Sequence, residues 1–254
     1  MDPVLYDVED GIATITFNRP DKLNSLLPES FDLLAQYADE AQRDDAVQAI
    51  IVTGAGERAF SVGGDLATVI PRATAGENIV VRDPAKRFFS DVFKPVVAAV
   101  NGACIAGGLE IMLGTDLRIV SETATFGLAE VRVGVVPAGG SHVRLPRQIP
   151  WAIAMQMLLT GEPIDARRAY EVGLVNEVVP AADVLARARK LATSIAQCGP
   201  VAVRTAKEIA VRAMALEPAF ALEHALGERV FRTDDAREGP LAFTEKRPPN
   251  FTGR

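Results

Sequence analysis

Alternating apolar and polar positions mark the first part of the chain, between residues 4 and 17, where β-branched and aromatic side chains flank Asp10-Gly11. This pattern predicts a β-hairpin. Apolar side chains then recur with a helical period over 28–44, and the apolar run 49–53 predicts a short buried strand. Two strands, a helix and a further strand therefore begin a ββα rhythm.

The same rhythm is predicted again in the middle of the chain. Residues 96–100 form an apolar strand pattern, 107–113 a short helix and 116–121 another strand. No strict sequence repeat accompanies it, so the repetition is structural. The intervening stretch 67–90 is irregular, and we interpret it as a solvated loop and helix, with a role as an active-site flap as the alternative.

Helical patterns dominate after residue 138. The sequence predicts an α/β fold with more helix than strand, divided near residue 198 into a mixed core, 1–198, and a helical C-terminal region, 199–254. The predicted helices cover 151–159, 165–171, 182–197 and 201–226, followed by a tail whose first half is helical.

Composition narrows the possible functions. The chain has 254 residues, 48% of them hydrophobic, which is enough for one sizeable core. Lysine and arginine number 27 against 33 acidic residues, and the resulting charge of −6 argues against a general nucleic-acid binder. The longest apolar stretch, 95–109, contains Asn101 and several glycines, so we expect no membrane span. We expect a soluble, cytoplasmic protein.

Cysteine and histidine are too few for a disulfide framework or a zinc centre. Cys104 and Cys198 are the two cysteines, and His142 and His224 lie far apart and outside any HExxH pattern. Phosphate-binding patterns of the GxGxxG and GxxxxGK[ST] types are absent. These observations argue against a metal enzyme and against nucleotide-dependent chemistry.

Two glycine-rich segments, 59–66 and 101–110, each follow a predicted strand. Glycines at the end of a strand allow backbone amides to approach a ligand closely. The second segment also opens a helix, whose first amides are unsatisfied and lie at the positive end of the helix dipole. Together these segments predict an oxyanion hole built from backbone N–H groups.

Two glutamates accompany the loops. Glu110 lies one helical turn after Gly107, beside the predicted oxyanion hole, although a glutamate in a first turn also simply favours the helix dipole. Glu130 lies among apolar residues, where an ionised group must find partners or shift its pKa. Both are candidates for acid–base chemistry.

Five motifs in order resemble the enoyl-CoA hydratase/isomerase (crotonase) superfamily, most like a bacterial enoyl-CoA hydratase. They cover nearly the whole chain, and they are NRP with LNSL at 18–26, AFSVGGDL at 59–66, AVNGACIAGGLE at 99–110, AEVRVGVVPAGG at 129–140 and EGPLAFTEKRPPNF at 238–251. The resemblance implies a spiral of ββα turns with a C-terminal helical region that serves trimerisation and contacts coenzyme A.

The resemblance also implies roles at the active site. The amides of Gly64 and Gly107 would hold the thioester carbonyl, Glu110 would deprotonate water, and Glu130 would exchange a proton at the α-carbon. The presence of both acids favours water addition to a 2-enoyl-CoA. No metal or other cofactor is implied, because coenzyme A is part of the substrate.

Further positions match the family's substrate contacts. The resemblance implies an acyl-CoA substrate and a homotrimer or a dimer of trimers. The implied contacts are Lys22 and Leu23 near the nucleotide, Val62, Asp65 and Leu66 near the pantetheine, Gly108 and Pro137 near the substrate, and Phe243 and Lys246 from the tail, which would reach the adenine in a neighbouring subunit.

Several departures keep other reactions open. Gly64 replaces a common alanine, and Leu128 with Ala129 resembles the carnitinyl-CoA dehydratase branch more than ordinary hydratases. His142 is interpreted either as a contact to an unusual acyl group or as a surface residue at a helix start. The alternatives are therefore a dehydratase acting on a polar chain, a 3-enoyl-CoA isomerase or a non-catalytic acyl-CoA-binding relative. An RNA-binding relative is disfavoured, because the stretch 29–45 is acidic.

Overall fold

The strands of the chain form two sheets. The computed structural model describes residues 2–80 and 83–253, so positions 81 and 82 of the irregular stretch lie outside the described residues. Within the described ranges, a larger sheet has the order β1-β2-β3-β5-β7-β10 and a smaller one the order β4-β6-β8-β9. The strands are β1 (Val4–Glu9), β2 (Ile12–Phe17), β3 (Ala49–Gly54), β4 (Ala59–Ser61), β5 (Val96–Val100), β6 (Ala103–Ile105), β7 (Leu117–Ser121), β8 (Thr125–Gly127), β9 (Ile164–Asp165) and β10 (Glu177–Val179).

Successive strand pairs alternate between the two sheets. The first strand of each pair β3-β4, β5-β6 and β7-β8 joins the larger sheet and the second joins the smaller one. A helical segment follows each pair, namely α2 (Leu66–Thr74), α3 (Gly107–Leu113) and the 3₁₀ helix η2 (Ala129–Val133). With the opening β1-β2-α1 unit, in which α1 spans Pro28–Arg43, this confirms the predicted spiral of ββα turns.

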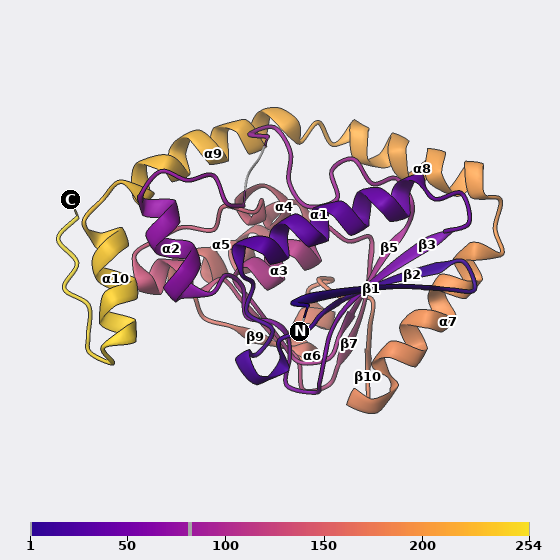
Figure 1. The fold of residues 1–254 in the computed structure, drawn as a ribbon, viewed down its shortest axis with the longest axis horizontal. Coiled ribbons are helices and arrows are strands. Elements are labelled where there is room, and N and C mark those ends of the chain that lie inside the picture. The colour runs from indigo at the N-terminus through magenta and orange to yellow at the C-terminus, as the bar shows by residue number, and fades with distance from the viewer. Residues whose placement is uncertain (1, 81–82, 254) are drawn as a thin grey trace.

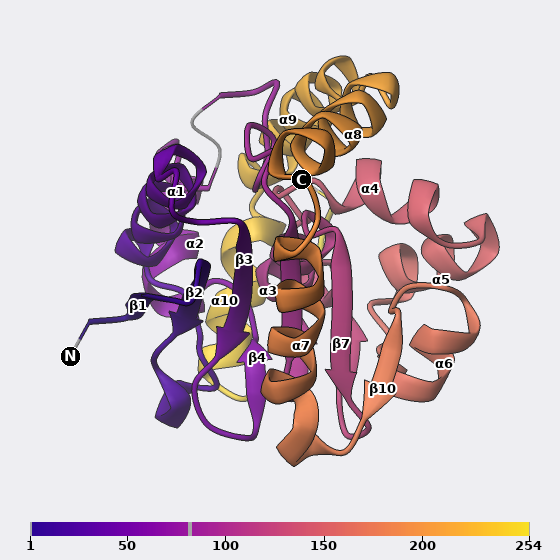
Figure 2. The ribbon, with the colours of Figure 1, turned by 90° about the vertical axis from the view of Figure 1, so that its right-hand side faces the viewer.

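Parallel pairing explains the apolar strand sequences. The β1/β2 hairpin is antiparallel as predicted, and β2, β3, β5, β7 and β10 then pair in parallel. Every residue of β3 and β5 is buried, because both faces of the larger sheet are covered. On one face Ile51 and Val97 pack against Ala188 of α7 (Val184–Ala196), which lies along the sheet in Figure 2.

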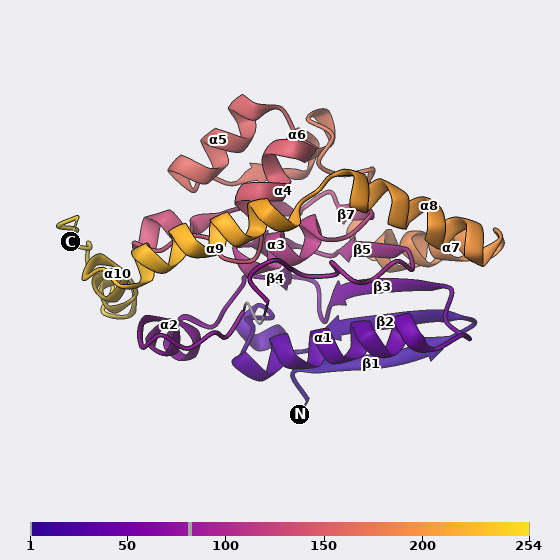
Figure 3. The same ribbon diagram turned by 90° about the horizontal axis from the view of Figure 1, so that it is seen from above.

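The C-terminal helices close over the core. These are α8 (Pro200–Ala213), α9 (Glu217–Phe231) and α10 (Asp235–Thr244), and Figures 1 and 3 show α8 and α9 running along one side with α10 beside α2. Helix α9 contacts α4 (Ser141–Gln148), and α10 contacts both α2 and η2. The remaining elements are α5 (Trp151–Thr160), α6 (Ala166–Glu171), η1 (Pro20–Lys22) and η3 (Ala181–Asp183).

One predicted element is corrected by the structure. The single helix expected over 201–226 is two helices, because Ala215 adopts a positive φ of 47° and Pro218 opens a new helix. Proline disfavours helical backbone in the residue before it, so it starts a helix more readily than it continues one. The stretch 67–90 contains a helix as expected, since its first part belongs to α2. The domain boundary near residue 198 stays a prediction.

Within residues 2–80 and 83–253, no helix is both long enough and apolar enough to span a bilayer.

Candidate active site

The two glycine-rich loops meet at the ends of β4 and β6. Gly63 has a φ of +83°, and a Cβ placed on it would lie 2.7 Å from the Gly107 nitrogen, so only glycine fits there. A Cβ on Gly107 would lie 3.7 Å from the Gly64 nitrogen. The backbones of the two loops are therefore in contact, with the predicted oxyanion-hole amides close to each other.

Backbone strain and hydrogen bonds fix this junction. Ala106, directly before α3, has a φ of 54°, a conformation that costs energy for a residue with a Cβ. Its amide donates to the Gly127 carbonyl at 2.8 Å. In the facing loop, Ser61 Oγ accepts from the Gly63 amide at 3.1 Å and donates to the Asn24 carbonyl at 2.8 Å. Both loops are thus held in place before any ligand arrives.

A cavity of about 530 Å³ opens in front of the junction. Its walls come from both loops, α2, α3, η2, α9 and α10, and most of its lining is apolar. Among the residues singled out from the sequence, it is lined by Leu23, Val62, Gly64, Asp65, Leu66, Gly107, Glu110, Glu130, Pro137 and Phe243. The fold therefore brings both glutamates and both glycines to one cavity.

Glu110 is buried and firmly held. Only 4% of the residue is exposed, and its Oε1 accepts hydrogen bonds from the Gly139 amide at 2.7 Å, the Ser141 amide at 3.2 Å and Ser141 Oγ at 3.0 Å. Burial, with the charge of Glu223 as a second cause, raises the pKa of Glu110 to about 7, although the bonds from Ser141 act in the opposite direction. Such a carboxyl gains and loses a proton near neutral pH.

Glu130 has different surroundings. Its Oε2 is buried without a hydrogen-bond partner among the described residues, and the fully buried Leu128 lies two positions before it. Burial first, and then the charge of Glu110, raise the pKa of Glu130 well above its ordinary value. Glu130 therefore favours its protonated form, as expected when two carboxyl groups share a dry pocket.

Comparison with known proteins decides the family. A model of the enoyl-CoA hydratase/isomerase family matches residues 7–254. The chain belongs to this family.

Relatives within the family carry several names. An (E)-benzylidenesuccinyl-CoA hydratase of Thauera aromatica is 39% identical, with 99% of each chain covered. An enoyl-CoA hydratase of Mycobacterium tuberculosis is 41% identical over 94% of this chain and 92% of that one. A solved structure titled carnitinyl-CoA hydratase, from Mycobacterium avium, is 35% identical, covers 99% of both chains and superposes with a TM-score of 0.88.

Three of the residues that match the family's substrate contacts do not line this cavity. Lys22, at the end of η1, and Lys246, just after α10, are exposed at the surface. Gly108 is buried beneath the loop junction, where a Cβ would lie 2.3 Å from the Ser61 carbonyl oxygen. Only glycine fits at this position, because α3 packs closely on β4. Their roles in substrate binding stay predictions.

Neither interpretation of His142 holds in full. It does begin α4, but it does not line the cavity, and it is not simply a surface residue. Its amide donates to Glu223 Oε1 at 3.2 Å, and its Nδ1 lies 3.3 Å from the same oxygen. The reason is tertiary, because Glu223 comes from α9, a helix packed on α4.

One wall of the cavity was missed from the sequence. His224, Glu228 and Phe231 line it from α9, at spacings of four and three residues that place them on one helical face. That spacing is the signal by which they can be found. Phe31 of α1 also lines the cavity, although the sequence pattern assigns it only to the core.

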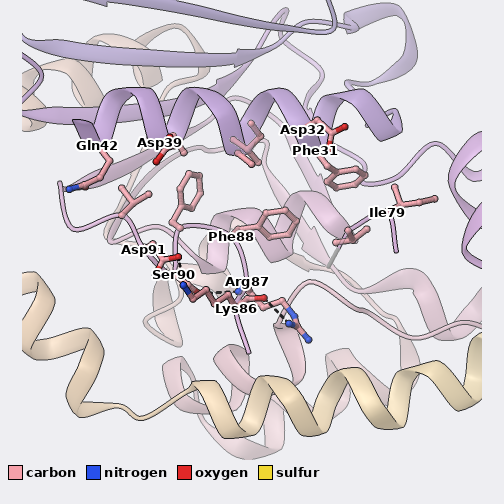
Figure 4. A pocket seen from close by; sticks show the side chains of 16 residues that line it. Phe31, Asp32, Asp39, Gln42, Ile79, Lys86, Arg87, Phe88, Ser90 and Asp91 are labelled. Carbon is pink, nitrogen blue, oxygen red and sulfur yellow. Dashed lines mark hydrogen bonds and ion pairs between the residues drawn. The ribbon is translucent and has the colours of Figure 1, made fainter. Parts of the chain in front are cut away.

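A second cavity of about 250 Å³ lies beside the first, between α1 and residues 86–92 (Figure 4). Phe31, Ile79 and Val80 line both cavities. The ring of Phe31 stacks on that of Phe88 with centroids 6.2 Å apart. Residues 86–92, at the end of the irregular stretch, thus form a wall next to the candidate active site.

In residues 2–80 and 83–253, no cluster of three or more His, Cys, Asp or Glu side chains could hold a metal ion. Both cysteines are free, Cys104 buried and Cys198 exposed.

Proposed function

We propose that the protein is an enoyl-CoA hydratase that adds water reversibly across the double bond of a 2-enoyl-CoA thioester. One observation carries the proposal. Two carboxyl groups face the same cavity as the junction of two glycine loops: Glu110 is buried and held by backbone and hydroxyl donors, and Glu130 has a buried oxygen with no hydrogen-bond partner among the described residues. This combination suits a reaction that needs a base, an acid and an anion hole at once.

The proposed reaction assigns one task to each carboxyl group. The Glu110 carboxylate takes a proton from water as the water oxygen bonds to C3 of the substrate. The C2=C3 electrons move toward the thioester carbonyl, and the Glu130 carboxyl delivers its proton to C2. The proton on Glu110 then replaces the one lost from Glu130 by exchange with solvent, so the net change is the addition of one water molecule.

The loop junction stabilises the charge that develops during this step. Enolate character builds on the thioester oxygen, so the amides of Gly64 and Gly107 act most strongly in the transition state. Both amides belong to a backbone already fixed by Gly63 and by the strained Ala106. Little reorganisation is then required during the reaction.

Coenzyme A is proposed to enter past the cavity wall formed by Leu23 and the stretch 62–66. Lys22, adjacent to that wall and exposed, suits a phosphate group of the nucleotide. Phe243 lines the cavity of its own chain and is still 63% exposed, which leaves ring surface for an adenine or for a neighbouring subunit. Lys246 is proposed to act beside it.

The same proposal includes a homotrimer or a dimer of trimers. Large apolar side chains remain exposed on α5 (Trp151, Leu159), α8 (Val201, Ile209) and α9 (Leu222). Exposed apolar side chains of this size favour association with another chain. Light scattering or sedimentation of the purified protein distinguishes a monomer, a trimer and a hexamer.

The activity is tested with crotonyl-CoA and with longer and branched 2-enoyl-CoAs. Hydration removes the conjugated enoyl-thioester absorbance, and we expect that absorbance to fall in the presence of the enzyme. Tight binding of coenzyme A thioesters without loss of absorbance would contradict the proposal and favour a non-catalytic relative. Conversion of a 3-enoyl-CoA alone would favour an isomerase.

A second candidate is the dehydration of a hydroxyacyl-CoA with a polar chain. Buried Leu128 leaves Glu130 Oε2 without a partner among the described residues, and His224 and Glu228 give one cavity wall polar groups. Relatives named carnitinyl-CoA dehydratase, such as that of Proteus mirabilis at 37% identity, belong to the same family. Including carnitinyl-CoA in the substrate series tests this candidate directly.

A further inference from the structure

A buried ion pair lies behind the catalytic cavity and is not used by the mechanism above. Arg87 Nε and Glu223 Oε2 are 3.0 Å apart, with side chains only 1% and 4% exposed. Arg87 comes from the segment that walls the second cavity, and Glu223 comes from α9. Burying two charges is expensive unless their remaining polar atoms are satisfied.

The guanidinium of Arg87 is satisfied on several sides. Nη1 donates to the carbonyls of Lys86 at 2.7 Å and Pro84 at 3.1 Å, and Nη2 donates to the carbonyl of Phe220 at 3.0 Å. The guanidinium carbon also lies 5.3 Å from the centre of the Phe220 ring. Arg87 is therefore fixed, and it fixes the carboxylate of Glu223 in turn.

The other carboxylate oxygen of Glu223 accepts a hydrogen bond from α4, the helix whose first turn also donates to Glu110. Glu223 Oε1 accepts from the His142 amide at 3.2 Å, while the amide of the preceding residue, Ser141, donates to Glu110 Oε1 at 3.2 Å. Two adjacent amides at the start of α4 thus bind two different carboxylates. A movement of Glu223 would shift the same turn of backbone that positions Glu110.

The charges around both carboxylates come from several elements. Glu223 faces Arg87 from the segment before β5, His142 and Arg144 from α4, and Glu110 from α3. The charge of Glu110 in turn raises the pKa of Glu130 in η2. The charge of Glu223 raises the pKa of Glu110, and the charge of His142 lowers it.

We propose that Glu223 is a positioning residue for the hydration reaction, which acts through the first turn of α4 and is locked by Arg87, so that Glu110 is both correctly placed and sufficiently basic. This inference rests on the proposed function, because it presumes that Glu110 is the base. It assigns a task to a carboxylate that does not line the cavity. It also links residues 84–88, which include Arg87, to the basicity of Glu110.

The principal variant is Glu223→Gln. Removing the negative charge lowers the pKa of Glu110, so the acid limb of the profile of kcat/KM against pH moves to lower pH. A weaker and less well-placed base should also reduce kcat at high pH by roughly tenfold, with KM for crotonyl-CoA changed about twofold or less. Glu223→Asp, which keeps the charge, should restore the wild-type position of the acid limb.

A structural defect alone must be separated from this effect. Arg87→Gln/Glu223→Gln replaces the buried ion pair with two neutral amides, which avoids an unpaired buried arginine. We expect the acid limb of kcat/KM to move to lower pH in this double variant, as it does in Glu223→Gln. Glu217→Gln is the matched control, because Glu217 is an exposed carboxylate on the same helix. It should leave both the pH profile and kcat unchanged.

A second readout does not depend on turnover. The infrared band of the protonated Glu110 carboxyl, recognised by its absence in Glu110→Gln, should disappear at lower pH in Glu223→Gln than in the wild type. If the enzyme hydrates crotonyl-CoA but neither the band nor the acid limb moves in the single or double variant, the inference is wrong. If the band moves but no 2-enoyl-CoA is hydrated, the proposed function fails while the link between Glu223 and Glu110 stands.

Discussion

Glu110 and Glu130 face the same cavity, yet their surroundings differ in nearly every respect. Glu110 projects from the first turn of a helix and receives hydrogen bonds from Gly139 and Ser141. Glu130 lies in a 3₁₀ turn, with Oε2 unpartnered within the described part of the chain. Donors stabilise a carboxylate, whereas burial without donors stabilises a carboxylic acid. The difference teaches that one cavity can hold a base and an acid of the same residue type.

The largest effect is expected from removing either carboxyl group. Glu110→Gln and Glu130→Gln should each lower kcat for crotonyl-CoA hydration by roughly 10³-fold, within the ~10²–10⁴ range of general acid–base catalysis. Steady-state loss of enoyl-thioester absorbance measures the change. Full hydratase activity in Glu130→Gln would break the comparison, because the protonated member of the pair would then be unnecessary.

A stability effect of the opposite sign should accompany the loss of activity. Glu110 has an ordinary pKa of 4.5 in the unfolded chain and about 7 in the folded protein, so the folded state keeps a proton that the unfolded state releases between these values. Wild-type stability should therefore fall as the pH rises from 4.5 to 7. Glu110→Gln, which lacks this penalty, should be more stable above pH 7 by roughly 3 kcal/mol.

Denaturant unfolding at several pH values tests this expectation, with Glu217→Gln as a control for a general change of charge. The two proteins should approach equal stability below the pKa of an unperturbed glutamate. A stability difference that does not depend on pH would show that Glu110 is not the group that carries the raised pKa.

The two glycine-rich loops hold the thioester carbonyl, on which the reactions of both carboxyl groups depend. Changing these loops should therefore reduce activity without altering the difference between Glu110 and Glu130. Gly63→Ala places a Cβ 2.7 Å from the Gly107 nitrogen at a φ of +83°, and it should lower kcat by roughly 10²-fold by pushing the loops apart. Gly64→Ala is the matched neighbour, because the atoms nearest to its Cβ belong to the Val69 side chain, the first of them at 3.3 Å. It should retain most of the activity, and similar losses in the two variants would argue against the loop junction as the anion hole.

The smallest effect concerns the hydroxyl donor to Glu110. Ser141→Ala removes the bond of 3.0 Å from Oγ but keeps the bond from the amide. Because this donor lowers the pKa of Glu110, its loss should move the acid limb of kcat/KM to higher pH, opposite to Glu223→Gln. We expect kcat to change only a few-fold, and a shift toward lower pH would contradict the assigned role of Ser141.

Local patterns in the sequence predict the parts of the molecule that depend on neighbouring residues. The hairpin around Gly11, the first helix, the buried strands and the short helix after Gly107 are confirmed. Both glutamates and both loop glycines line one cavity, while the roles that the family resemblance implies for them stay predictions. The three-residue strands β4, β6 and β8 were missed, since a segment of that length has too little periodicity to be recognised.

Contacts between distant residues are the part that the sequence does not reveal. Arg87 and Glu223 are separated by 136 positions, and nothing in either local pattern indicates that the two charges pair inside the protein. The sequence pattern assigns His142 to the substrate or to the surface for the same reason, because its partner Glu223 comes from a helix 81 positions away. Such pairs are fixed by tertiary packing, which overrides what each residue type suggests alone.

The division of labour between the two glutamates is tested most directly by exchange of the α-protons of butyryl-CoA in deuterated water. This saturated thioester needs no water addition, so only the residue that handles the α-carbon is required. The account predicts that Glu110→Gln still catalyses exchange, since removing the charge of Glu110 lowers the pKa of Glu130, and that Glu130→Gln does not. Exchange that persists in Glu130→Gln but is lost in Glu110→Gln would reverse the two roles and contradict the account.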